Sequence, residues 1–145
     1  MIRAVIFDMD GVIIDSEPVY MARQEAYLTA RGRSFLRSEL NGLVGASDRE
    51  AWDLLLRLAG DGVTLEELKE DYRNYQVGQP PVDYRGILNP GFCETAGRLR
   101  ERGIRLALAS SSPLKHIQAV LKECGIENCF EQVVSGQQFI KSKPD

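Results

Sequence analysis

The sequence is poor in the residues from which several classes of protein are built. Its 145 residues include three cysteines and one histidine, and the cysteines form no Cys-x-x-Cys pair. An odd, scattered set of cysteines argues against a disulfide framework, and a zinc site would need more ligands than these. We expect Cys93, Cys124 and Cys129 to be reduced, partly buried thiols, which favours a cytoplasmic protein.

An excess of charge of one sign and a long apolar run are also lacking. The 18 Lys and Arg residues are interspersed with 21 Asp and Glu residues, for a net charge of −3. Nothing here resembles a polybasic face for nucleic acid or an anionic membrane. Asp8 and Asp10 interrupt the N-terminal apolar run, so we expect neither a signal peptide nor a membrane span. The hydrophobic content of 43% predicts a globular protein with a real core.

The most informative segment is the run VIFDMDGVIIDSE at residues 5–17. A short apolar strand leads directly into Asp8 and Asp10 and then into a turn at Gly11. Side chains two positions apart on an extended strand point the same way, so both carboxylates can address one ligand. A lone Asp-x-Asp would indicate only a loop or a helix cap, whereas this context favours a site.

The block from residue 16 to 84 carries helical signals and no strand pattern. An apolar stripe marks a helix over residues 16–31, formed by Val19, Ala22, Ala26 and Ala30. Capping boxes open two more helices: Ser47 with Glu50, and Thr64 with Glu67, the latter helix running to about residue 77. The stretch Gly-Gln-Pro-Pro at residues 78–81 then indicates a linker.

From about residue 85 onward, helices and strands alternate. Asn89 and Pro90 predict a helix start, residues 104–109 a parallel strand covered on both faces, Ser112 and Pro113 the next helix, and Val133 a short strand. This order predicts an α/β fold: a Rossmann-like, doubly wound parallel sheet built from residues 1–15 and 85–145. The all-helical block at 16–84 is predicted to be an inserted cap.

The run at residues 5–17 resembles the nucleophile motif of the haloacid dehalogenase superfamily, and more narrowly its β-phosphoglucomutase-like phosphatase branch. The resemblance implies a cap inserted directly after the nucleophile loop. It implies that Asp8 attacks phosphorus to form an aspartyl-phosphate, and that Asp10 acts as general acid and base. It also implies Mg²⁺ bound by Asp8 and by the backbone carbonyl of Asp10.

Further positions match the family pattern less tightly. The resemblance implies that Ser110, with Ser111, binds the transferring phosphoryl group at the carboxyl end of its strand. It implies that Lys143, which precedes Pro144, offsets the anionic charge, with Lys141 as the competing candidate. Arg49 follows a segment like the substrate-facing cap loop. The plainer alternatives are a turn cap for Ser110, the cap of the following helix for Ser112, a solvated tail for Lys143 and an exposed helix residue for Arg49.

These matches predict a Mg²⁺-dependent phosphatase of a small phosphorylated metabolite, most simply a sugar phosphate. A β-phosphoglucomutase-type mutase and a non-catalytic fragment are the alternatives. Family members continue through a further strand with acidic metal ligands, whereas this sequence stops at Asp145. We therefore expect an incomplete sheet, weak Mg²⁺ binding and no measurable activity for this length. The open sheet edge is expected to recruit a second copy or to retain a C-terminal fragment.

Overall fold

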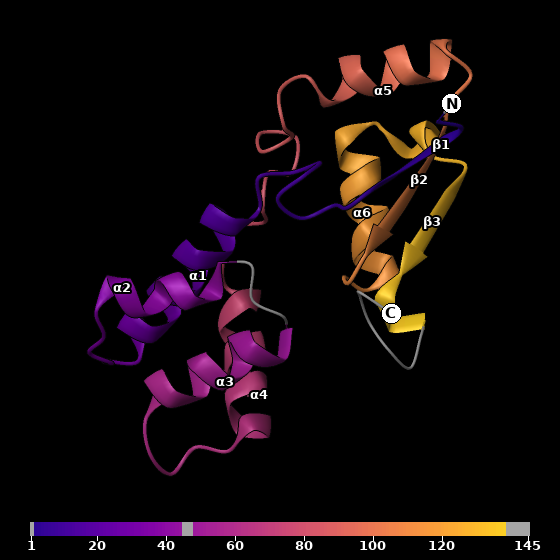
Figure 1. Cartoon of the computed structure of the whole chain (residues 1–145). Coiled ribbons are helices and arrows are strands. Elements are labelled where there is room, and N and C mark those ends of the chain that lie inside the picture. Colours follow the sequence, from indigo (N-terminus) through magenta and orange to yellow (C-terminus); the bar gives the residue numbers. More distant parts are fainter. Residues whose placement is uncertain (1, 45–47, 139–145) are drawn as a thin grey trace. The chain divides into compact units, whose positions relative to one another are not determined.

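The structure is a computed structural model that describes residues 2–44 and 48–138. The chain divides into two compact units. The α/β unit comprises Met1–Ser16 and Asp83–Asp145, and the helical unit comprises Glu17–Val82. Each unit has its own hydrophobic core, and each is described by itself (Figure 1).

The α/β unit is built on a three-stranded parallel sheet in the order β1-β2-β3. Its strands are β1 (Ala4–Phe7), β2 (Arg105–Ser110) and β3 (Gln132–Ser135). Helix α5 (Phe92–Glu101) precedes β2, and helix α6 (Leu114–Cys124) connects β2 to β3. Short 3₁₀ turns follow at η2 (Glu127–Cys129) and η3 (Gly136–Gln138). The predicted α/β fold with a parallel sheet is confirmed.

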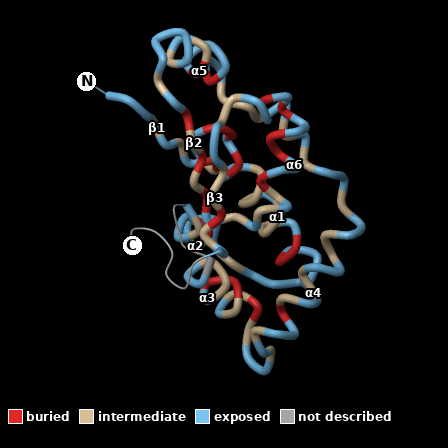
Figure 2. The backbone as a smooth tube through the Cα atoms, turned by 90° about the vertical axis from the view of Figure 1, so that its right-hand side faces the viewer, coloured by how far each residue is buried: buried red, intermediate tan, exposed pale blue. Residues whose placement is uncertain are grey.

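Burial alternates along the strands, so the two faces of the sheet differ. Leu106 and Leu108 of β2 are buried in one cluster with Phe92 of α5 and Ile117 of α6. Figure 2 shows the backbone coloured by burial, with buried segments in β2 and α6. Ile6 of β1 points to the opposite face and is 70% exposed. Neighbouring side chains along a strand point to opposite faces. In β2, which was predicted to be covered on both faces, Leu106 and Leu108 on one face are buried, and Ala107 and Ala109 on the other are half-buried.

Glycines with positive φ mark the ends of these helices. Gly91 (φ 83°) is the N-cap of α5, so this helix begins at Phe92 rather than at the predicted Pro90. Gly125 (φ 69°) is the C-cap of α6. Glycine adopts this left-handed conformation without the steric cost of a Cβ, which explains why both helices stop or start there.

The helical unit contains α1 (Glu17–Ala30), α2 (Arg37–Leu40), the 3₁₀ turn η1 (Asn41–Leu43), α3 (Asp48–Ala59) and α4 (Leu65–Val77). The predicted capping box of Thr64 and Glu67 is confirmed at the start of α4. The one predicted at Ser47 lies outside the described residues. No helix in the described parts of the chain is long and apolar enough to cross a membrane.

The helix predicted over residues 16–31 is present as α1, and its apolar stripe is not its buried face. Ala22, Ala26 and Ala30 are exposed, whereas Tyr27 and Leu28 are buried in the core of the helical unit. Burial stabilises in proportion to the apolar area removed from water, and an alanine side chain offers little of it. The large side chains therefore decide which face of this helix turns inward.

A polar cluster joins α1 to α4. The Tyr27 hydroxyl donates to Asp71 Oδ2 at 2.8 Å, and Arg31 donates to both oxygens of the same carboxylate, at 2.7 Å and 2.6 Å. Burial, reinforced by the neighbouring Asp71 carboxylate, raises the pKa of Tyr27 to about 12. The hydrogen bonds from Arg31 and then Tyr27 lower the pKa of Asp71. This cluster ties the two longest helices of the unit together.

Candidate active site

The chain turns sharply where β1 ends. The carbonyl oxygen of Met9 accepts from the amides of Ile13 at 2.9 Å and Ile14 at 3.1 Å. The amide of Gly11 (φ 73°) donates to the Ile14 carbonyl at 2.8 Å. A residue with a Cβ is strained at such a φ, so glycine suits this position. The turn fixes the backbone that carries both acidic side chains.

Asp8 and Asp10 have different surroundings in this turn. Asp8 is exposed, and its Oδ1 accepts from the amide of Met9 at 2.8 Å. Asp10 is half-buried: its Oδ1 accepts from Ser16 Oγ at 2.8 Å, and its Oδ2 accepts from Ser112 Oγ at 3.0 Å. The Met9 side chain between them is fully buried. One carboxylate is thus accessible, and the other is held by two hydroxyls.

The end of β2 supplies serines beside this turn. Ser110 is 2% exposed, and its Oγ accepts from the amide of Ser112 at 3.1 Å, which is a serine turn of the i, i+2 type. Ser111 is exposed. Ser110 therefore stabilises the turn between β2 and α6, which was the plainer alternative for this residue. Its hydroxyl accepts in this hydrogen bond, so its proton can still be donated to another group.

Ser112 does not cap the following helix, which corrects the expectation for that residue. The N-cap of α6 is Pro113, and no side chain caps it. Proline has no amide hydrogen and is tolerated in the first turn, so the helix can begin there without a serine cap. The Ser112 hydroxyl is directed to Asp10 instead.

The end of β3 also contacts the segment that follows β2. Ser135, fully buried at the end of β3, donates from Oγ to the Ser112 carbonyl oxygen at 2.6 Å. A Cβ on the next residue, Gly136, would lie 3.2 Å from the Ser111 Cα, so glycine permits this close approach. Sequence reasoning missed Ser16 and Ser135 as parts of the site. Ser135 had a positional signal, because it ends a strand and ligands gather at the carboxyl ends of parallel strands. Ser16 lies beyond the turn, directly before α1, and had no such signal.

The structure leaves the remaining sequence candidates untested. Lys143 and its competitor Lys141 lie outside the described residues. Arg49 lies in α3 of the helical unit, where its side chain is 91% exposed and its Nε is 3.9 Å from Asp53 Oδ2. Such a long, exposed ion pair within one helix contributes little. Its proposed role in substrate binding stays a prediction.

The donor chemistry at the turn fits a hard cation. Within residues 2–44 and 48–138, no three His, Cys, Asp or Glu side chains are grouped so that they could hold a metal ion. Mg²⁺ does not require such a cage, because it keeps several waters and binds one or two carboxylates together with substrate phosphate. The Asp8 carboxylate and the Asp10 carbonyl are oxygen donors of the required kind.

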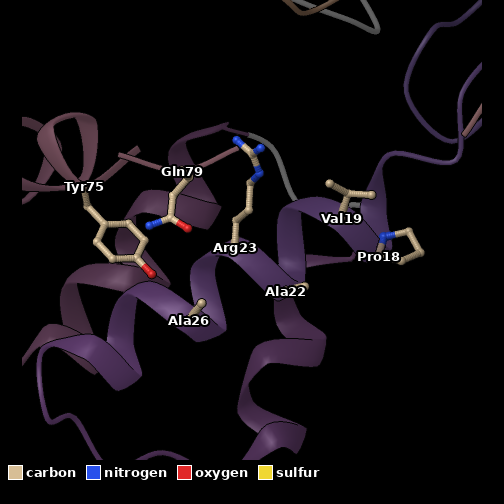
Figure 3. A pocket seen from close by; sticks show the side chains of 7 residues that line it. All are labelled: Pro18, Val19, Ala22, Arg23, Ala26, Tyr75 and Gln79. Carbon is tan, nitrogen blue, oxygen red and sulfur yellow. The ribbon is translucent and has the colours of Figure 1, made fainter. Parts of the chain in front are cut away.

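A separate hollow lies within the helical unit (Figure 3). Its volume is about 410 Å³, and its lining residues are Pro18, Val19, Ala22, Arg23, Ala26, Tyr75 and Gln79. The Arg23 guanidinium is bonded to Gln76 Oε1 at 2.9 Å and to the Pro80 carbonyl. The hollow is lined mainly by apolar groups, including Ala22 and Ala26 of the predicted apolar stripe. It offers no nucleophilic carboxylate or hydroxyl besides the Tyr75 phenol.

The comparison with protein families identifies the class to which this fold and turn belong. The family model of haloacid dehalogenase-like hydrolases matches residues 2–145. Because the match spans nearly the whole chain, the chain belongs to this family. The resemblance expected from residues 5–17 is confirmed.

Within this family, the chain is similar to proteins named as phosphatases and as a β-phosphoglucomutase. The chain is 28% identical to a phosphorylated carbohydrates phosphatase of Thermotoga maritima, covering 99% of this chain and 65% of the relative. It is 30% identical to a phosphoglycolate phosphatase of Rhodobacter capsulatus, and the match covers 100% of this chain and 67% of that relative. A Thermotoga maritima structure, provisionally described as a β-phosphoglucomutase, is 29% identical to this chain and matches its fold with a TM-score of 0.73. The match covers 99% of this chain and 66% of that structure. The chain thus spans about two thirds of the length of these relatives.

Proposed function

We propose that the protein is a phosphatase of small phosphorylated metabolites, with sugar phosphates as the first candidates. The observation that carries this proposal is the pairing of an accessible Asp8 with an Asp10 held through both carboxylate oxygens, two residues apart on one turn. Relatives named for phosphorylated carbohydrates and phosphoglycolate support the substrate class.

In the proposed first step, an Asp8 carboxylate oxygen attacks phosphorus, and the bond from phosphorus to the substrate oxygen breaks. Asp10, in its protonated form, transfers its proton to the departing alcohol oxygen. The product alcohol leaves, and Asp8 carries the phosphoryl group as an acyl phosphate. The exposure of Asp8 suits it to attack, while the hydroxyls on Asp10 suit it to deliver a proton in a fixed direction.

In the proposed second step, Asp10 accepts a proton from water as the water oxygen attacks phosphorus. The bond from phosphorus to the Asp8 oxygen breaks, inorganic phosphate leaves, and both side chains return to their starting states. Ser110 and Ser111, with the free amides at the start of α6, are proposed to receive the phosphoryl oxygens. Lys143 is proposed to add positive charge there.

Mg²⁺ is proposed to be held by the Asp8 carboxylate and the Asp10 carbonyl, together with water and substrate phosphate. When bound, it neutralises negative charge on the phosphoryl group and so allows the anionic Asp8 to approach.

We further propose that the helical unit is the cap. The chain leaves the α/β unit at Ser16, whose hydroxyl is bonded to Asp10, six residues earlier in the sequence. It returns at Asp83. Small-angle scattering with and without a phosphate analogue tests this proposal: a decrease in the radius of gyration on binding supports closure, and an unchanged radius argues against it.

The three thiols fit the expected reducing environment. Cys93, Cys124 and Cys129 are free, and burial raises the pKa values of Cys124 and Cys129, which keeps both protonated at neutral pH. We propose a cytoplasmic location on this basis. Fractionation of the source cells would test it, and recovery in an oxidising compartment would contradict it.

A phosphosugar mutase is the second candidate, favoured by the β-phosphoglucomutase likeness of the Thermotoga maritima structure. The decisive experiment incubates the protein in its natural length with sugar phosphates and phosphoglycolate, with Mg²⁺ or with a chelator. Release of inorganic phosphate that stops on chelation and resumes with Mg²⁺ supports the phosphatase. Isomerised sugar phosphate without phosphate release favours the mutase, and neither product favours a non-catalytic chain.

A further inference from the structure

Ser112 contacts the ends of all three strands through three different groups. Its amide donates to Ser110 Oγ at 3.1 Å, next to the end of β2. Its carbonyl accepts from Ser135 Oγ at 2.6 Å, at the end of β3. Its own Oγ donates to Asp10 Oδ2 at 3.0 Å, in the turn after β1. The backbone of Ser112 is thus anchored to two strands, and only its side chain reaches the third.

The ordinary explanation for a serine at this position does not apply. A serine between a strand and a helix usually caps the helix by accepting from its first amides. Here Pro113 is the N-cap without any side-chain cap, and the Ser112 hydroxyl is a donor to the Asp10 carboxylate in the turn after β1. The side chain serves Asp10 rather than α6.

We propose that Ser112 is the positioning residue that fixes the orientation of the Asp10 carboxylate. The inference rests on the proposed function of Asp10. The Ser16 hydroxyl binds Oδ1 alone, and a carboxylate held through one oxygen can still rotate about its terminal torsion, which is broad and soft. A second donor on Oδ2 removes this rotation. Because Ser112 is itself bonded on both sides, its hydroxyl transmits the rigidity of the sheet to the carboxylate.

The proposal predicts a loss that depends on the leaving group. An alkoxide is a poor leaving group, so its departure requires a well-aimed proton from Asp10. A p-nitrophenolate leaves without this proton. A misdirected Asp10 therefore lowers kcat/KM, which covers only the steps through departure of the leaving group, for an alkyl phosphate and spares it for p-nitrophenyl phosphate. General damage to the fold lowers kcat/KM for both.

The experiment compares Ser112→Ala, Ser112→Thr and the matched control Ser38→Ala in the protein of natural length. Ser38 is an exposed serine of α2. In Ser112→Ala, kcat/KM for an alkyl phosphate should fall about 10–100-fold, and for p-nitrophenyl phosphate less than about 3-fold. Ser112→Thr keeps the hydroxyl and should recover most of the loss. In the Asp10→Asn background, Ser112→Ala should cause no further decrease in kcat/KM for the alkyl phosphate.

Equal losses on the two substrates, or a full additional loss in the Asp10→Asn background, would overturn the proposal. A second readout needs no turnover and separates this failure from failure of the proposed function. In protein labelled with ¹³C at the aspartate Cγ, the Asp10 resonance is assigned by its absence in Asp10→Asn. It should shift in Ser112→Ala and stay in Ser38→Ala. An unshifted resonance in Ser112→Ala contradicts the inference, even if the wild-type protein hydrolyses none of the phosphates tested.

Discussion

The two units use polar side chains in different ways. In the α/β unit, hydroxyls converge on one carboxylate at the strand ends, where Asp10 accepts from Ser16 and Ser112. In the helical unit, Arg31 and Tyr27 converge on Asp71 and link two helices. Both arrangements satisfy an anionic group, but only the first places it beside a second, accessible carboxylate.

The partners of the two carboxylates explain the difference. A guanidinium bound through two hydrogen bonds neutralises Asp71 and keeps it ionised, which suits a structural link. The serine hydroxyls bonded to Asp10 carry no charge and can donate or accept a hydrogen bond. This contrast supports the proposal that Asp10 takes part in the reaction, whereas Asp71 links two helices.

The largest expected effect is on activity, from Asp8→Asn. An amide is a poor nucleophile, so phosphatase turnover of the protein in its natural length should fall by at least about 10³-fold, with little change in melting temperature. Ser110→Ala should lower turnover less, by about 10²-fold, because it removes one hydrogen bond to the phosphoryl group. Initial rates of phosphate release check both, with Asp71→Asn as the scaffold control that should retain turnover. Similar residual rates in Asp8→Asn and Ser110→Ala would refute the role of Asp8.

The largest expected effect on stability comes from the covered face of the sheet. Leu108 is fully buried, so Leu108→Ala should lower the free energy of unfolding by about 2–5 kcal/mol. Ile6 points to the other face at 70% exposure, so Ile6→Ala should change it by about 0.5 kcal/mol or less. Urea denaturation measures both. A loss at Ile6 as large as that at Leu108 would contradict the difference between the two faces and would mean that another segment or a second copy covers Ile6.

A smaller effect is expected from the scaffold carboxylate. Asp71→Asn should lower the free energy of unfolding by about 1 kcal/mol at neutral pH, because the Arg31 pair is partly exposed. The pKa of Asp71 is lowered in the folded state, so its contribution is present above the ordinary pKa of aspartate and is lost as the pH falls through the lowered value. Urea titrations of both proteins from pH 7 to pH 2 should therefore converge in acid. A difference that grows as the pH falls would contradict this assignment.

The sequence predicted the α/β unit better than the helical unit, for physical reasons. The alternation of apolar strands and capped helices was strong enough to locate β2 and α6, and the spacing of Asp8 and Asp10 placed both on one turn. For α1, equal weight on small and large apolar residues led to the wrong face, because burial of Tyr27 outweighs that of several alanines.

The partners of Asp10 could not be predicted because they depend on strand register. Ser112 is 102 residues from Asp10 in the sequence, and their contact requires β1 and β2 to pair with Phe7 beside Leu108. No local pattern encodes this register. The same holds for Ser135, which reaches Ser112 because β3 pairs with β2 so that Ser110 lies beside Ser135.

The central claim is that Asp8 carries the phosphoryl group while Asp10 only transfers protons. The most direct test quenches a reacting mixture in acid, reduces the trapped acyl phosphate with borohydride, and locates the resulting homoserine by peptide mass spectrometry. If Asp8 is the nucleophile, homoserine is found at position 8, Asp10 is unmodified, and Asp8→Asn gives no homoserine. Homoserine at position 10, or continued turnover with neither aspartate modified, would contradict it.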